Sequence, residues 1–240
     1  MRQTDKLWGG FALIQDDRFF KLGQDSMLLS AFAAPPSRAK IMDLGCGNGA
    51  LGVLLCARHA GVTVTGLEIQ PEVAALAQEN VELNGLQQRM TVIQGDLKQH
   101  KGLFATGSFD YVVCNPPYFS QNSGFSAKGH NRLTARQEAE CNAADAIQAA
   151  AYLVKFGGRA AFVYRPERMV ELIADMRKYQ LEPKRLRFVH QHAQAVPSAV
   201  LIEARRGSAP GVQVLPPLLV CDMDGTQTAE YRAIYHQEEF

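Results

Sequence analysis

The chain has 240 residues, of which 47% are hydrophobic and 20% charged, a composition that indicates a folded globular protein and excludes a disordered one. The formal net charge of +1 at pH 7 does not by itself indicate a nucleic-acid partner. Any basic surface that binds nucleic acid must therefore be local. The five cysteines are odd in number, widely spaced and in no Cys-x-x-Cys pair, which argues against a disulfide framework or a zinc site and for reduced thiols in the cytoplasm.

The N-terminal stretch shows no targeting signal. Residues 1–6 lack the apolar core of a signal peptide, and no uncharged apolar run in the chain reaches the ~18–20 residues that a membrane span needs. We therefore expect a cytoplasmic protein with no membrane partner.

A hairpin and a helix are predicted before residue 40. Residues 11–22 have the pattern of a hairpin with Asp16 and Asp17 at its turn. An apolar helical run at residues 27–32 follows, for which Asp25 or Ser26 would be a good N-cap. A second interpretation of Asp25 stays open, namely that its carboxylate lies beside a bound cofactor.

From residue 40, short apolar segments alternate with amphipathic ones. Strands are predicted at residues 40–44, 62–69, 90–94, 109–114 and 158–165, and helices at residues 50–59, 71–83, 138–155 and 166–179. This alternation implies right-handed crossovers and a parallel sheet that is covered on both faces. Strands at residues 184–190 and 199–206, joined by a loop through Pro197, have no helix between them and predict an antiparallel pair at one edge.

The prediction is therefore an α/β, Rossmann-like fold with helices on both faces of a mostly parallel sheet. Its domain would occupy residues 40–206, preceded by a hairpin and helix extension at residues 1–39. Residues 207–240 would form an appendage that packs back on the domain. We expect a monomer rather than an obligate oligomer.

A glycine-rich loop lies between the first strand and the first helix of this region, in the order Asp43, Leu44, Gly45, Cys46, Gly47, Asn48, Gly49. Glycines let the chain turn tightly and let a ligand approach the backbone closely. With Ala50 the loop also satisfies a loose dinucleotide fingerprint, so the loop alone leaves two cofactor classes open. Asp43 and the lack of a basic residue in the loop favour a cofactor without phosphates.

Acidic residues also end the next two strands. Glu68, followed by Ile69, stands about where an acid grips a ribose hydroxyl pair, and Asp96, followed by Leu97, could accept from an adenine amino group. Each acid taken singly could be a turn residue or a helix cap. Three acids at three successive strand ends, together with the glycine loop, indicate an adenosine-bearing cofactor.

The fourth strand of the α/β region runs directly into Asn115, Pro116, Pro117 and Tyr118. Two prolines can neither continue the strand nor enter a helix interior, so the chain leaves the sheet in a stiff, extended step. A planar base could stack on Tyr118 and donate its amino N–H bonds to the Asn115 side-chain oxygen and the Pro116 carbonyl. The alternative is a rigid turn that only closes the strand.

At these residues the chain resembles the class I S-adenosylmethionine-dependent methyltransferases, over residues 40–206. The resemblance implies seven strands, six parallel and the last antiparallel, and S-adenosylmethionine as cofactor. It also implies that Asn115 and the Pro116 carbonyl hold the target nitrogen while Tyr118 stacks on the target. The cofactor residues that we expect are Asp25, Asp43, Gly45, Cys46, Gly47, Asn48, Gly49, Glu68, Ile69, Asp96, Leu97 and Asn115.

Residues 20–32 and 218–235 resemble one subfamily, the bacterial tRNA adenine-N6 methyltransferases that act beside the anticodon of a valine tRNA. Tight positioning of base and methyl donor would supply most of the catalysis, and no histidine spacing suggests a metal, so none is expected. Methylation of a protein glutamine at N5 uses the same four residues, but those enzymes usually carry an N-terminal helical domain. Guanine-N2 methylation of ribosomal RNA, DNA adenine methylation and a non-catalytic RNA-binding protein with the cofactor pocket also remain open; a nicotinamide dehydrogenase is disfavoured.

Two runs without acidic residues, 111–137 and 183–202, carry the candidate RNA contacts. Basic side chains there would give salt-dependent affinity for phosphates, and aromatic ones would stack on bases. Residues 119–136 would form a flexible lip that orders on RNA. A solvated surface is the alternative for both runs. The residues in question are Phe119, Phe125, Lys128, Arg132, Arg136, Lys184, Arg185 and Arg187.

Overall fold

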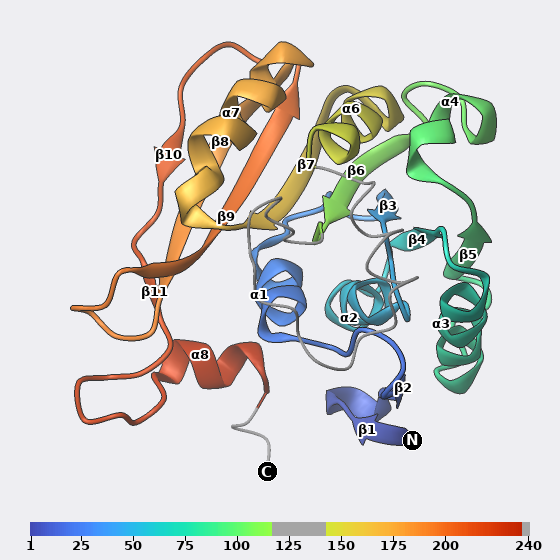
Figure 1. Cartoon of the computed structure of the whole chain (residues 1–240), viewed down its shortest axis with the longest axis horizontal. Coiled ribbons are helices and arrows are strands. Elements are labelled where there is room, and N and C mark those ends of the chain that lie inside the picture. The colour runs from blue at the N-terminus through green and yellow to red at the C-terminus, as the bar shows by residue number, and fades with distance from the viewer. Residues whose placement is uncertain (117–142, 237–240) are drawn as a thin grey trace.

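A mixed β-sheet runs through the middle of the molecule in the computed structural model, which describes residues 1–116 and 143–236 (Figure 1). Its strand order is β10-β8-β9-β7-β6-β3-β4-β5, and β11 also pairs with β8. Strand β9 is antiparallel to β7 and β8, whereas β3, β4, β5, β6 and β7 pair in parallel. The order and the single reversed strand confirm the predicted Rossmann-like fold. The seven principal strands are β3 (Lys40–Leu44), β4 (Thr63–Glu68), β5 (Met90–Gln94), β6 (Phe109–Cys114), β7 (Val154–Tyr164), β8 (Leu181–His190) and β9 (Pro197–Arg206).

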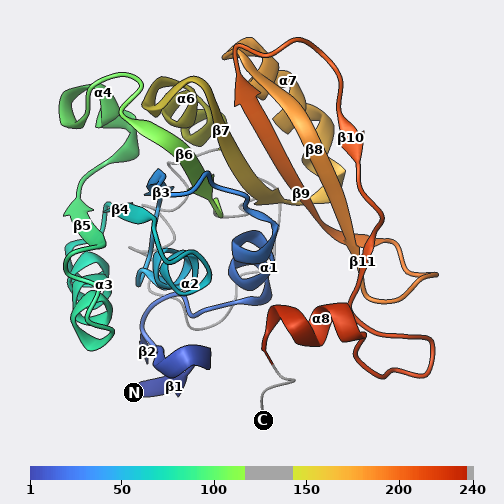
Figure 2. The ribbon, with the colours of Figure 1, turned by 180° about the vertical axis from the view of Figure 1, so that it is seen from behind.

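Helices cover both faces of the sheet, as Figure 1 and the view from behind in Figure 2 show. One layer holds α1 (Gln24–Phe32), α2 (Ala50–Arg58) and α3 (Pro71–Leu83); the other holds α4 (His100–Leu103), α6 (Ala143–Leu153) and α7 (Met169–Lys178). Because side chains alternate along a strand, Ile41 packs in the core under the first layer and Met42 in the core under the second. The central strands are therefore apolar on both faces, as parallel strands require.

The N-terminal hairpin differs from its prediction. Its strands are β1 (Arg2–Lys6) and β2 (Ala12–Asp16), and a 3-10 turn at Trp8–Gly10 joins them. The placement of the turn at Asp16 and Asp17 was wrong. Gly9 and Gly10 have φ values of 62° and 83° and so allow the reversal at that point.

Helix α1 also begins differently from the prediction. Its N-cap is Gly23, in an extended conformation and without a side-chain capping bond. Asp25 and Ser26 therefore lie inside the first turn, and the prediction that one of them caps the helix was wrong. A carboxylate in the first turn still interacts favourably with the helix dipole.

Several boundaries moved by a few residues. Strand β7 starts at Val154 rather than at residue 158, and Pro197 is the first residue of β9 rather than part of the loop. Proline is tolerated at the first position of a strand because its missing N–H is not yet needed there. Residues 138–142 of the predicted long helix lie outside the described residues.

The C-terminal stretch extends the sheet at the β8 edge. Two short strands, β10 (Gln213–Val214) and β11 (Leu218–Leu219), pair in parallel with β8. Helix α8 (Ala229–Ile234) follows and buries Tyr231 and Ile234 in the core that α1 and α2 share. Tyr231 accepts a hydrogen bond at 3.3 Å from the Gln24 side chain, so this stretch contacts the start of α1.

Candidate functional site

The glycine loop and Asn115 begin side by side. Leu44, the last residue of β3, and Cys114, the last residue of β6, are Cα partners in neighbouring parallel strands. The Cys114 thiol also donates to the Leu44 carbonyl, with 3.3 Å between sulfur and oxygen. Strand β4 ends at Glu68, which pairs with Gln94 at the end of β5. The strand ends chosen from the sequence therefore share one edge of the sheet, the edge at which open α/β sheets bind ligands.

The glycine loop is held against the sheet by its own backbone. The N–H groups of Gly45 and Cys46 donate to the Leu67 carbonyl at 2.9 and 3.0 Å, and the Gly47 N–H donates to Glu68 Oε2 at 3.0 Å. Gly45 and Gly47 have φ values of 68° and 56°, a region that favours glycine. At both positions a Cβ would have no described atom within 4 Å, so the loop has room for a ligand at van der Waals distance from the backbone.

Two buried carboxylates lie at the base of this loop. Asp43 is 1% exposed and Glu68 is 6% exposed. Burial raises the pKa of Asp43 to about 7, and the negative charge of Glu68 adds to this effect. The pKa of Glu68 is also raised by burial, against the N–H bonds that it accepts from Gln70 and Gly47. A cationic ligand would stabilise both charges.

Two polar atoms at the loop lack partners among the described residues, namely Asp43 Oδ2 and Asn48 Nδ2. Buried polar groups are nearly always hydrogen-bonded, so such atoms need an explanation. One acceptor and one donor next to an open glycine backbone fit a ligand that carries both kinds of polar group.

The third acid has a local role in the structure. Asp96 Oδ1 accepts from the Lys98 N–H at 2.9 Å and caps the 3-10 turn Leu97–Gln99. Leu97 is half-buried, and Ile69, directly after β4, is 42% exposed. These apolar side chains at two adjacent strand ends offer a surface for a planar ring.

Asn115 is oriented by a residue that the sequence did not single out for this purpose. Its Nδ2 donates to the Ser26 hydroxyl at 3.1 Å. Since the nitrogen of the Asn115 amide faces Ser26, its oxygen Oδ1 lies on the other side of the amide group. Ser26 is buried, and its neighbour Asp25 is half-buried. The first turn of α1 therefore lies beside Asn115. Pro117, Tyr118, Phe119, Phe125, Lys128, Arg132 and Arg136 lie outside the described residues.

A cavity of about 160 Å³ opens at the ends of β7 and β9. Strand β7 is the neighbour of β6, with Phe162 opposite Cys114, so the cavity lies one strand beyond Asn115. Sequence reasoning missed Arg165 here, although a charged residue at the end of a predicted strand is the same signal that selected Glu68. The lining residues are Gln24, Asp25, Tyr164, Arg165, Ser198 and Ala199.

The basic residues proposed on β8 have partners within the chain. Lys184 donates to the Ala209 carbonyl at 3.1 Å, and Arg187 pairs with Glu230 at 2.7 Å. Arg185 lies 3.3 Å from the buried Glu203 and over the ring of Phe32. These contacts neutralise part of the positive charge and join β8 to other elements. An additional contact with RNA stays a prediction for these three residues.

Within residues 1–116 and 143–236, no group of three or more His, Cys, Asp or Glu side chains is placed to hold a metal ion. The helices of this part of the chain are all too short or too polar to cross a bilayer.

Gly66 on β4 provides a test of how tightly the loop is packed. A Cβ at this position would meet Cys46 Sγ at 2.7 Å and Cys46 Cβ at 3.0 Å. Gly66→Ala is therefore expected to push the loop outward and to lower the free energy of unfolding by roughly 1–3 kcal/mol, the usual cost of overpacking. Urea denaturation measures this change in the free energy of unfolding. Gly102→Ala is the control, because its Cβ would meet nothing within 4 Å; equal stabilities of the two variants would contradict the prediction.

Comparison with known proteins agrees with this site. Residues 23–139 match the family model described as "Methyltransferase small domain". Among solved structures, a predicted O-methyltransferase, protein Atu636 from Agrobacterium tumefaciens, superposes with a TM-score of 0.73 at 23% identity, over 89% of this chain and 96% of that one. At this identity the likeness shows the fold alone.

Two curated relatives carry the same name, tRNA1(Val) (adenine(37)-N6)-methyltransferase. The protein from Haemophilus influenzae is 32% identical over 154 residues, which are 64% of this chain and 65% of that relative, slightly less than two thirds of its length. The protein from Porphyromonas gingivalis is 28% identical over 201 residues, 81% of this chain and 78% of the relative. The strand order, the glycine loop and these matches agree: the chain has the Rossmann-like methyltransferase fold, and its residues 23–139 match the methyltransferase small domain.

Proposed function

We propose that the protein transfers a methyl group from S-adenosylmethionine to the exocyclic N6 of an adenine in tRNA. The target would be the adenine 3′ of the anticodon of a valine tRNA, and the reaction would take place in the cytoplasm, where tRNA is used. The observation that carries the proposal is the pairing of Leu44 with Cys114, which starts the glycine loop and Asn115 side by side. The names of the relatives from H. influenzae and P. gingivalis support the choice of nucleotide.

The residues at the carboxyl edge fit the cofactor. Glu68 would accept from a ribose hydroxyl pair, and the apolar Ile69 and Leu97 would flank an adenine, with Asp96 beside it. The open backbone at the glycine loop and the unpartnered Asp43 Oδ2 suit the charged amino-acid end. When bound, S-adenosylmethionine supplies an electrophilic methyl group on a sulfonium.

Asn115 and Pro116 would hold the nucleophile. The adenine amino group is a weak nucleophile because its lone pair is delocalised into the ring. Two neutral acceptors, Asn115 Oδ1 and the Pro116 carbonyl, would orient the N–H bonds so that the nitrogen lone pair points out of the ring system and toward the methyl group. No strong base is then needed. Holding two reactants in line can supply roughly 7–11 kcal/mol of the barrier. Tyr118 would stack on the adenine.

The cavity at β7 and β9 is the place we propose for the flanking nucleotides. It lies at β7, the neighbour of the strand β6 that leads into Asn115, and Arg165 brings a positive charge to its lining. Phosphate contacts of this kind give affinity without sequence preference. An anticodon-loop purine is already partly unpaired, so extruding it costs less than extruding a base from a duplex. The predicted basic and aromatic residues of 119–136 would complete the RNA surface.

The experiment that tests the function offers the protein several classes of substrate in separate reactions. Labelled S-adenosylmethionine is incubated with the protein and with separated total tRNA, ribosomal RNA or a peptide release factor, and the labelled product is hydrolysed and identified. We expect N6-methyladenosine in the tRNA fraction, and its loss from a valine tRNA whose adenine 37 is replaced by guanine. Label in glutamine or in ribosomal guanine would transfer the activity to the alternative substrates, and no label anywhere would favour a non-catalytic binding protein.

A further inference from the structure

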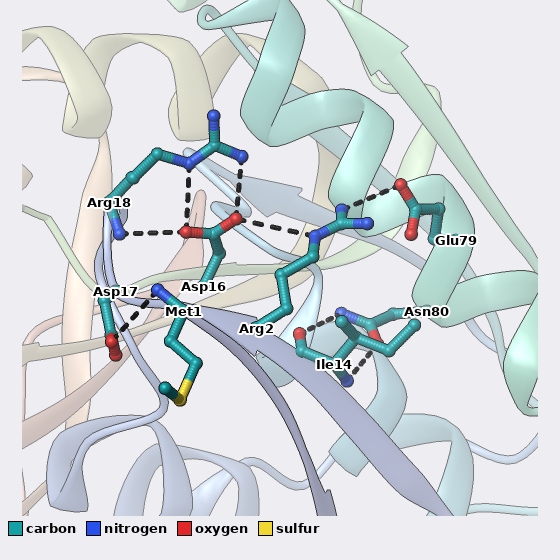
Figure 3. Close-up of polar contacts among 8 residues, drawn as sticks. All are labelled: Met1, Arg2, Ile14, Asp16, Asp17, Arg18, Glu79 and Asn80. Carbon is teal, nitrogen blue, oxygen red and sulfur yellow. Dashed lines mark hydrogen bonds and ion pairs between the residues drawn. The ribbon is translucent and has the colours of Figure 1, made fainter.

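The N-terminal hairpin is fastened to helix α3 by paired polar contacts, which Figure 3 shows. Arg2 lies between Glu79 of α3, at 2.9 Å, and Asp16 of β2, at 3.5 Å. The next residue of α3, Asn80, accepts from the Ile14 N–H at 2.6 Å and donates to the Ile14 carbonyl at 3.0 Å. Its amide group therefore pairs with β2 as a neighbouring strand would.

Asn80 makes a further contact on its other side. Its Nδ2 also donates to the backbone carbonyl of Asn48, in the glycine loop, at 2.9 Å. Asn80 is fully buried, with 0% exposure, and both hydrogens of its amide nitrogen are used. A single buried side chain thus connects the hairpin, the helix and the glycine loop.

The glycine loop is consequently held from two directions. On the sheet side, Gly47 donates to Glu68, and Gly45 donates to Leu67. On the helix side, Asn80 holds the Asn48 carbonyl. A left-handed glycine backbone is intrinsically free to change conformation, so fixing both sides lowers the entropy that the loop would lose when it binds a ligand.

We infer that Asn80 is a positioning residue for the cofactor loop and that the N-terminal hairpin is its outer support. The inference rests on the proposed function, because it assigns the residue to the binding of S-adenosylmethionine. Asn80 acts through the Asn48 backbone, and the hairpin keeps the amide in place through Ile14.

The chain offers a matched control one helical turn later. Asn84 accepts from the Ala12 N–H and donates to the Ala12 carbonyl, both at 2.8 Å, so that it holds β2 as Asn80 does. Its remaining bond goes to the Asn80 carbonyl within α3, at 2.7 Å, and not to the glycine loop. The two side chains therefore separate support of the hairpin from support of the loop.

The test compares Asn80→Asp with Asn84→Asp, in which a donor becomes an acceptor that faces two carbonyls. Calorimetry gives the Kd for S-adenosylhomocysteine, steady-state kinetics gives KM and kcat, and urea denaturation gives stability. We expect Asn80→Asp to raise Kd and KM by about tenfold or more, which corresponds to about 1.4 kcal/mol, with kcat nearly unchanged. Asn84→Asp should lower stability but keep Kd within about twofold of wild type. The neutral pair Asn80→Ser and Asn84→Ser serves if either carboxylate variant does not fold.

The outcomes separate this inference from the proposed function. Wild-type protein that does not bind S-adenosylhomocysteine would overturn the proposed function, and the inference with it. If the wild type binds, an unchanged Kd in a folded Asn80 variant would overturn the inference alone. An equal rise in Kd for the Asn80 and Asn84 variants would also overturn it, because general loosening of the hairpin would then account for both.

Discussion

Replacing Asn115 by alanine is expected to lower turnover at least about 100-fold, the scale for losing one preorganised polar contact to the reacting group. The substitution removes the Oδ1 that would accept an amino hydrogen of the target base. The bond to this hydrogen strengthens as the nitrogen becomes positive in the transition state, so kcat falls more than substrate affinity. The Kd for S-adenosylhomocysteine should change far less than kcat, because Asn115 is only one of the expected cofactor residues and the glycine loop and Glu68 are untouched.

Ser26→Ala is the graded control for this variant. The Ser26 hydroxyl accepts from Asn115 Nδ2 at 3.1 Å and orients the amide, but it leaves Oδ1 in place. Losing one neutral hydrogen bond costs about 0.5–1.5 kcal/mol, so we expect kcat to fall less than about 15-fold. Single-turnover kinetics with purified tRNA and saturating cofactor measures both variants. Full activity of Asn115→Ala would remove this residue from the mechanism.

Asp43→Asn is expected to change stability and ligand binding in opposite directions. Burial, with a contribution from Glu68, raises the pKa of Asp43 from 3.8 to about 7. Between these values the native state holds a proton that the unfolded state releases, so the free energy of unfolding falls as pH rises from about 4 to about 7. An uncharged asparagine removes this penalty; at 1.36 kcal/mol per pKa unit the gain for the ligand-free protein at pH 8 is at most roughly 4 kcal/mol.

The same substitution should weaken binding of the cofactor. The sulfonium and ammonium groups of S-adenosylmethionine are positive, and they would favour the charged form of the carboxylate that burial disfavours. We expect the Kd for S-adenosylmethionine to rise at least about tenfold, which corresponds to about 1.4 kcal/mol. Thermal denaturation from pH 4 to pH 8, with and without the ligand, gives both effects.

Asp110→Asn is the control of opposite sign. Although burial pushes its pKa upward, the Lys155 ammonium and the Lys40 N–H hold the pKa of Asp110 below its ordinary value. Charged Asp110 therefore stabilises the native state at neutral pH, and this stability is lost as pH falls through its native pKa. Asp110→Asn should lower stability at pH 8, whereas Asp43→Asn should raise it. A loss of stability in both variants would show that Asp43 is not destabilised by burial.

The sequence by itself determined the α/β fold and the edge of the sheet at which the site lies. Hydrophobic periodicity, glycines in the loop after β3 and the prolines after β6 are local signals, because each reflects the backbone conformation or burial of the segment that carries it. Parallel strands then bring their carboxyl ends to one edge without further information. The sequence alone therefore places the strand ends at Leu44, Glu68 and Cys114 together, and the structure pairs these strands as neighbours.

Only the tertiary structure decided which side chains meet at that edge. The contacts of Ser26 with Asn115 and of Asn80 with Ile14 join residues 89 and 66 positions apart. The sequence pattern likewise did not predict the hairpin turn at Gly9 or the pairing of Arg185 with Glu203. Polar side chains such as these look alike in the sequence whether they cap a helix, face water or bridge two elements. Their partners are fixed by packing of distant segments, and no local propensity encodes that packing.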